Sequence, residues 1–308
     1  MAFTAADVKN LREMTGVGMM DCKKALTETD GDMDKAVEYL REKGLAKAAK
    51  KAGRIAAEGV SYALVENGVG ALVEVNCETD FCAKSAPFVA FVKDIAKVVA
   101  DNDPADVDAL MNCKYPGTEL TVSETMPEKV MSIGENLQIR RFVRFAENTS
   151  VGYVHAGGKI GVLVNLAVEG GVDATEIGKN VAMQIAALNP RFWDKSQVGQ
   201  DVLDEEKKIM MVQMENDPKM ASKPAQVKEK IVMGKMNKFY EENCLLQMEF
   251  VRGDLFSGTV EQYIADAGKK LGGSVKFLTA VRYQTGEGIE KKEENFAAEV
   301  AAQMNQGK

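Results

Sequence analysis

VSYALVENGVGALVEV, at residues 60–75, recurs later in the chain as VGYVHAGGKIGVLVNL, at residues 151–166. The two copies align without a gap at an offset of 91 residues, so that Tyr62 matches Tyr153 and Gly70 matches Gly161. Each copy alternates apolar and polar residues around a polar turn that contains glycine, which is typical of a β-hairpin. The repeat therefore predicts two hairpins of one design.

Each hairpin is followed by a helical pattern and, further on, by a third strand. The helices are predicted at residues 86–100 and 174–188, and the strands at residues 138–146 and 275–283. The strand segments are rich in β-branched and aromatic residues, which suit a half-buried sheet. The fold class is therefore α+β, with a core of two repeated subdomains at residues 55–147 and 148–285. Each is expected to be an antiparallel sheet with helices on one face.

The first 54 residues read as a separate small helical domain. Helices are predicted at about residues 5–14 and 19–28, and a third follows with apolar residues at helical spacing, namely Met33, Ala36, Val37 and Leu40. A three-helix bundle of this size, residues 1–54, resembles a ubiquitin-associated-type (UBA-like) domain.

Two further helical segments are predicted, one inserted into the second subdomain and one after it. Residues 201–243 are charged and rich in methionine, and two helical runs there, 202–216 and 224–242, predict an antiparallel helical hairpin inserted into the subdomain and projecting from it. Residues 286–308 predict a C-terminal helix, on which Phe296, Val300 and Met304 form an apolar stripe. That stripe can dock either on the chain's own core or on a partner.

Composition and charge narrow the classes of function. The chain has 39 basic and 46 acidic residues and a net charge of −7, which weighs against a general binder of nucleic acid or of anionic membranes. No run of about 18 apolar residues predicts a membrane span, and the first ten residues lack the apolar region of a signal peptide. The five cysteines have no metal-type spacing, which indicates reduced thiols in a cytosolic protein.

The inventory of catalytic residues is short. His155 is the only histidine, so sites with several histidine ligands are excluded and any Ser/His/Asp or Cys/His triad would have to use it. It lies where a strand runs into a Gly-Gly turn, and we expect it to make contacts rather than act as a base. The sequence contains neither a GxxxxGK[ST] phosphate loop nor a strand–GxGxxG–helix fingerprint. We therefore expect that the chain itself binds no nucleotide, and the short inventory agrees with a function that needs no bound cofactor, no metal and no covalent chemistry.

The residues that follow each hairpin differ between the two copies. Residues 76–82 read NCETDFC, whereas the matched residues 167–173 read AVEGGVD. The fold evidently accepts a Gly-Gly turn there, yet the first copy carries Asp80 beside Phe81. Two interpretations remain open at this point. Asp80 can be a helix N-cap with Phe81 in the core, or Phe81 can be an exposed anchor for a partner.

The basic segment 47–54, KAAKKAGR, joins the helical domain to the first sheet. It is either a solvated linker or a contact to an acidic partner. A protein that binds RNA through this segment would show steep dependence on salt.

Five motifs make the whole chain similar to the bacterial-type elongation factor Ts family. They are VKNLREMTGVGMMDCKKAL and NCETDFCAK near the start, IGENLQIRR and YVHAGGKIGVLV in the middle, and EGIEKKEENFAAEVAAQM at the end. The resemblance implies an N-terminal helical domain, a core of two subdomains, a projecting coiled coil and a C-terminal helical module. It also implies a guanine nucleotide exchange factor for the translational GTPase elongation factor Tu, with no direct contact to nucleic acid or membrane and a cytoplasmic location.

The resemblance also implies which residues meet the partner. Asp80 and Phe81 would wedge into the GTPase together with their neighbours Thr79 and Cys82 and disturb its Mg²⁺ and phosphate-binding elements. The family usually has valine at the place of Cys82, which is a small and apolar departure. The other implied contacts are Arg12, Met19, Met20, Lys23, Ile133, Gly134 and His155. The rival functions are an adaptor that binds without accelerating nucleotide release, an RNA-associated translation protein, and an enzyme.

Overall fold

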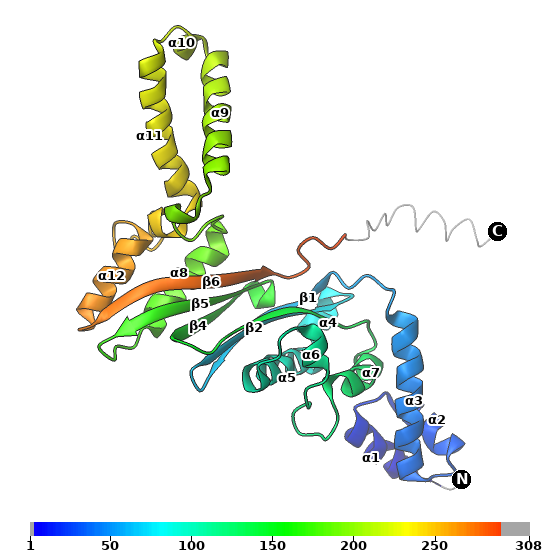
Figure 1. Cartoon of the computed structure of the whole chain (residues 1–308). Coiled ribbons are helices and arrows are strands. Elements are labelled where there is room, and N and C mark those ends of the chain that lie inside the picture. Colours follow the sequence, from blue (N-terminus) through cyan, green and yellow to red (C-terminus); the bar gives the residue numbers. More distant parts are fainter. Residues whose placement is uncertain (1–2, 291–308) are drawn as a thin grey trace, which may run out of the picture.

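The computed structural model describes residues 3–290, which form two three-stranded antiparallel sheets with helices around them (Figure 1). The first sheet has the order β1 (Glu58–Glu66), β2 (Val69–Cys77), β3 (Gln138–Phe145). The second has the order β4 (Thr149–His155), β5 (Ile160–Glu169), β6 (Ser274–Gln284). Both predicted hairpins and both third strands are confirmed.

The repeat extends to the detailed pairing of the strands. Each middle strand has a register shift against the third strand, between Glu74 and Val75 in the first sheet and between Asn165 and Leu166 in the second. These places are related by the same offset as the two sequences. The hairpin turns differ, because the first is closed by Asn67-Gly68 with positive φ at both residues and the second by the short 3₁₀ turn η1 (Ala156–Gly158).

The helices cover the outer faces of the two sheets. Helix α5 (Ala86–Asn102) packs on the first sheet, and α8 (Thr175–Leu188) and α12 (Val260–Lys270) pack on the second (Figure 1). Phe88, Phe91 and Ile95 of α5 are fully buried against the apolar residues of β2. Helices on one face of each sheet are therefore confirmed, which is the α+β architecture that the sequence predicts.

The inner faces of the two sheets pack against each other. Leu72 of β2 and Leu163 of β5 are fully buried between them. A side chain at Gly161 would strike Leu72, and one at Gly70 would strike Ser150 and Leu163. Small residues are required where the strands approach this closely. The core is thus made of four layers, helices outside and two sheets inside.

A buried carboxylate joins the sheets to the segment that follows β6. Glu74, with no exposed surface, accepts hydrogen bonds from Arg140 at 3.0 Å and from Arg141 at 2.6 Å. It also accepts one from the backbone N–H of Gly286 at 2.8 Å. Residues 285–288 form a turn rather than the start of a helix, so the predicted C-terminal helix does not begin at Gly286. The rest of that prediction, from residue 291, lies outside the described residues.

The N-terminal domain is a bundle of α1 (Ala5–Thr15), α2 (Met19–Glu28) and α3 (Met33–Lys51). Thr4 caps α1 through a capping box with Asp7, and Gly16 ends it in the left-handed conformation. The core of the bundle is not separate, because Met131 of α7 (Val122–Ile133) belongs to it and Gly44 lies against Pro127. The three predicted helices are present, and the bundle is docked on the core.

The basic segment 47–54 is only in part the linker of the first sequence interpretation. Residues 47–51 are the last part of α3, not a linker. Lys47 pairs with Asp21 at 2.9 Å, Lys51 donates to the carbonyl of Gly134, and Arg54 pairs with Glu78 at 3.4 Å. These three cations have partners within the chain that lie far away in sequence, so local patterns did not predict them. A contact of this segment to an acidic partner stays a prediction.

The inserted helical hairpin consists of α9 (Gln200–Asn216) and α11 (Ala225–Asn243), with the short α10 (Pro218–Ala221) at its tip. It projects from the second sheet as predicted (Figure 1). Met214 and Met236 are buried in its seam with Phe239. No helix within residues 3–290 has the length and apolar character needed to cross a membrane. The short helices α4 (Asp80–Lys84) and α6 (Val107–Met111), together with α7 and α12, were not foreseen.

Candidate functional site

The loop after β2 presents an exposed aromatic residue on a short helix. Thr79 is the N-cap of α4, and its hydroxyl accepts from the Cys82 backbone N–H at 3.1 Å. Phe81, in the first turn, has 83% of its surface exposed. The interpretation with Asp80 as the cap and Phe81 in the core is therefore wrong. The side chain of Phe81 is free to meet another molecule.

The side chain of Asp80 forms an ion pair within α4, the helix that also carries Phe81. Its carboxylate pairs with Lys84 at 2.6 Å. The hydrogen bond from Lys84 holds the pKa of Asp80 below its usual value, and the charge of Lys159 acts in the same direction. Asp80 is therefore ionised at neutral pH, next to the exposed ring.

Glu135 fixes the loop from across the site. One oxygen of its carboxylate accepts from the backbone N–H groups of Glu78 at 2.8 Å and Thr79 at 3.0 Å. The other accepts from the Thr79 hydroxyl at 2.6 Å. Hydrogen bonds to a charged acceptor are the stronger kind. The backbone that leads into Phe81 is thus positioned before any partner arrives.

Glu78 makes a reciprocal contact, to the segment that carries Glu135. Its carboxylate accepts from the Asn136 backbone N–H at 2.7 Å and pairs with Arg54. The side-chain amide of Asn136 donates in turn to the carbonyl of Arg54 at 2.8 Å. Residues 78–79 and 135–136 therefore hold each other through reciprocal hydrogen bonds. The segment that follows α3 is attached to both of them through Arg54.

Cys82 does not lie on the surface with Phe81. Only 7% of Cys82 is exposed, and with Cys77 it belongs to the apolar core under α4. Of the four residues that the resemblance groups here, Thr79 and Phe81 are exposed, Asp80 is half-buried and Cys82 is buried. A direct contact from Cys82 would require the loop to move.

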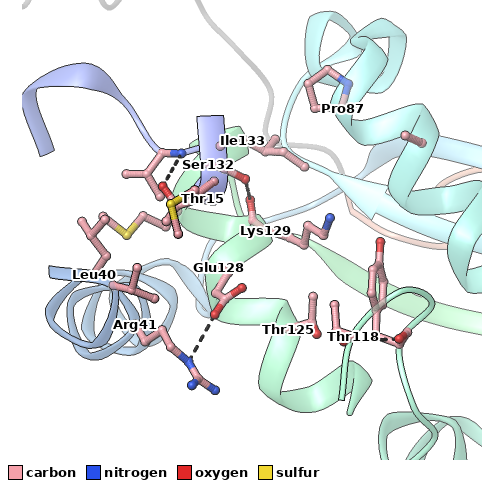
Figure 2. Close-up of a pocket in the computed structure, with 17 residues that line it drawn as sticks. Thr15, Leu40, Arg41, Pro87, Thr118, Thr125, Glu128, Lys129, Ser132 and Ile133 are labelled. Carbon is pink, nitrogen blue, oxygen red and sulfur yellow. Dashed lines mark hydrogen bonds and ion pairs between the residues drawn. The ribbon is translucent and has the colours of Figure 1, made fainter. Parts of the chain in front are cut away.

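The C-terminal end of α7 links this loop to the N-terminal bundle. Gly134 is the left-handed C-cap of α7, directly before Glu135. Ile133 is half-buried and lines a groove of about 500 Å³ between α7 and the bundle, which Figure 2 shows. Across that groove Arg41 of α3 pairs with Glu128 of α7 at 3.2 Å (Figure 2).

The N-terminal candidates are all exposed on α1 and α2. Met19 and Met20 are 52% and 75% exposed, and Arg12 and Lys23 also face solvent. A side chain at Gly16, between the two helices, would lie 3.9 Å from Ser132. This surface therefore borders the end of α7.

His155 ends β4 in the other sheet and is exposed. Its Nδ1 and the hydroxyl of Tyr153 share a hydrogen bond of 3.0 Å. The turn that follows it, η1, contacts β1, as α4 does, and the charge of Lys159 just after that turn acts on Asp80. Most candidates thus lie around α4 and α7, and His155 comes from the hairpin of the second sheet, where the charge of Lys159 reaches Asp80.

Sequence reasoning missed the residues that position the loop. Glu78, Glu135 and Asn136 were quoted within motifs but not singled out. The spacing of 57 residues between the Glu78 amide and the Glu135 carboxylate carries no local signal. Only the unusual composition of residues 76–82 pointed to this region.

Similarity to known proteins extends over almost the whole chain. The family model for elongation factor Ts matches residues 78–287. Elongation factor Ts of Clostridium botulinum (strain Eklund 17B / Type B) is 48% identical over 307 residues, covering 98% of this chain and 99% of that protein. Elongation factor Ts of Clostridium novyi (strain NT) is 47% identical over 309 residues, with the same coverage of 98% and 99%.

Proposed function

Since the chain belongs to the elongation factor Ts family, we propose that it promotes exchange of GDP for GTP on elongation factor Tu during translation elongation. This role involves no covalent chemistry, and it places the chain in the cytoplasm. The observation that carries the proposal for this chain is Phe81, 83% exposed on a loop that Glu135 holds in place.

The proposed mechanism is a wedge made by Asp80 and Phe81. Phe81 enters an apolar site of the GTPase, and Asp80 brings a negative charge close to the elements that hold Mg²⁺ and phosphate. Mg²⁺ demands nearly ideal octahedral geometry, so small displacements of its surroundings weaken its binding. A partner that binds this distorted state more tightly shifts the GTPase toward it. By linkage, nucleotide and exchange factor each weaken the binding of the other.

The remaining candidates extend the proposed contact surface. Arg12, Met19, Met20 and Lys23 provide a docking surface on the bundle, and Ile133 and Gly134 provide a second one at the end of α7. His155 adds a contact from the second sheet. In this proposal Thr79 and Cys82 support the wedge from behind, because one caps α4 and the other is buried beneath it.

The test is release of fluorescent GDP from elongation factor Tu, followed by stopped flow. Phe81→Ala is expected to lower the exchange rate by roughly tenfold or more, because truncating a buried aromatic anchor commonly costs about 2 kcal/mol. The thermal stability of the chain should hardly change, since Phe81 makes little contact with its own core.

Leu271→Ala is the matched control. Leu271 is 52% exposed in the turn between α12 and β6, at the opposite end of the core from α4 (Figure 1). This variant should exchange at the parental rate. If Phe81→Ala also left exchange unchanged, the wedge would be refuted. Binding of the parent chain without faster release of nucleotide would favour an adaptor instead.

A further inference from the structure

Three side chains that can each offer a ligand atom to a metal ion meet beneath the exposed loop. The Cys77 and Cys82 sulfur atoms and a carboxylate oxygen of Glu135 all lie within 4.8 Å of one another. Cys77 ends β2, Cys82 lies in α4, and Glu135 follows α7. The cluster thus joins three elements at the point where the loop is fixed.

The dimensions suit a tetrahedral ion. Zinc bonds of about 2.3 Å to sulfur and about 2.1 Å to oxygen place tetrahedral ligands roughly 3.5–3.8 Å apart. The separations, which lie within 4.8 Å, therefore need to shorten by about 1.3 Å at most. Zinc accepts thiolate sulfur, imidazole nitrogen and carboxylate oxygen as ligands, so a set of two thiolates and one carboxylate is chemically suitable. Glu135 is only half-buried, which leaves a side open to solvent for a fourth ligand.

A dication bound at the cluster would take the place of the thiol protons. The Cys77 thiol is in contact with Cys82, and this contact, burial and the charge of Glu135 raise its pKa. Three acidic groups so close repel one another when they ionise, and a bound dication relieves that repulsion. At present the Cys77 thiol donates to the Thr79 carbonyl at 3.2 Å, a proton that metal binding would release.

We propose that Cys77, Cys82 and Glu135 form a binding site for Zn²⁺. The ion would be held by two thiolates, one carboxylate oxygen and a water molecule. Glu135 also accepts hydrogen bonds from the Glu78 and Thr79 backbone amides. Binding of the ion would therefore change how firmly the backbone that carries Phe81 is held. The site itself stands independently of the proposed exchange activity, because it rests only on these three side chains.

The test is titration of the reduced, chelator-treated full-length chain with Co²⁺ in the absence of oxygen. Tetrahedral Co²⁺ bound to thiolate gives intense charge-transfer absorption, and Zn²⁺ should then displace it. One equivalent of Co²⁺ is expected to bind to the parent chain. The same result is expected for Cys113→Ala, which removes a thiol outside the cluster.

Cys82→Val should abolish the charge-transfer absorption while keeping an apolar side chain of similar size. Glu135→Gln should weaken Co²⁺ binding by about tenfold or more while the amide oxygen still accepts from the loop. It remains informative even if Cys82→Val folds poorly, which circular dichroism would reveal. Absent thiolate absorption in the parent, unchanged absorption in Cys82→Val, or a Cys77–Cys82 disulfide formed in place of metal uptake would each overturn the proposal.

Discussion

Replacing Gly152 by alanine should force the two sheets apart where β1 and β4 cross. A Cβ atom at Gly152 would lie 2.9 Å from the Ala63 Cβ and 3.6 Å from a Val65 methyl carbon. Carbon atoms that are not bonded prefer separations of about 3.5–4.0 Å. The Ala63 Cβ is fixed to its backbone and cannot rotate away. One of the strands must therefore move by several tenths of an ångström.

The magnitude follows from opposing contributions. Overpacking of this kind costs about 1–3 kcal/mol, and the lower chain entropy of alanine in the unfolded state returns about 0.5–1 kcal/mol. Gly152→Ala should thus lower the free energy of unfolding by about 1–2 kcal/mol. Ala63→Gly should cost a similar amount, because it loses about 0.8 kcal/mol of methyl burial and adds a flexible glycine to a strand.

The double variant decides whether these costs share one cause. Exchanging the two residues moves the methyl group to the other side of the contact and removes the clash. We therefore expect the double variant to be more stable than the sum of the single effects by about 1–2 kcal/mol.

Urea unfolding, followed by circular dichroism and by the fluorescence of Trp193, the single tryptophan, measures these energies. Gly234→Ala is the control, because Gly234 lies within α11. Among the described residues, no atom from outside the adjacent helix backbone lies within 4 Å of the position that its new methyl group would take. It should stabilise α11 by about 0.5–1 kcal/mol. A Gly152→Ala variant as stable as the parent, or strictly additive energies, would refute the close approach of the two sheets.

Three further predictions concern single side chains. Glu74→Gln should lower the free energy of unfolding by about 2–3 kcal/mol in urea, because it leaves Arg140 and Arg141 without their buried counter-charge, although both arginines are partly exposed. His155→Ala should slow nucleotide exchange only a few-fold, with flat profiles between about pH 6 and 8 in both proteins; a step in the parent that the variant lacks would identify a proton-transfer role. Burial raises the pKa of Cys244 from 9.0 to about 11. Between these values the unfolded chain has lost the thiol proton that the folded chain keeps, so stability should fall as pH rises, by up to about 3 kcal/mol. Cys244→Ala should reduce that fall when both proteins are unfolded in urea at pH 8 and pH 11, and an equal fall in both would contradict the assignment.

The sequence was sufficient for the elements that depend on local patterns. Alternation of apolar residues predicts the strands of both hairpins, because side chains point to opposite faces at every second residue. Apolar residues at helical spacing likewise predict α5 and α8. The short helices α4 and α6 were missed, since five residues are too few to show a helical period.

The candidate site was predicted only in part. Comparing the two copies singled out Asp80 and Phe81, because the matched Gly-Gly turn shows what the fold alone tolerates. That Phe81 is exposed, and that Glu135 holds the loop, required the structure. A carboxylate and an amide separated by 56 residues, as Glu135 and Thr79 are, meet only after the chain has folded.

By itself the sequence determined which residues of each strand share a face. Val73 and Val75 lie on one face of β2, and Gly70 and Leu72 lie on the other. Only the tertiary structure decided that this second face is buried against the other sheet. Alternation with a period of two fixes the side to which a residue points, but the partner on that side is set by contacts between segments far apart in the chain.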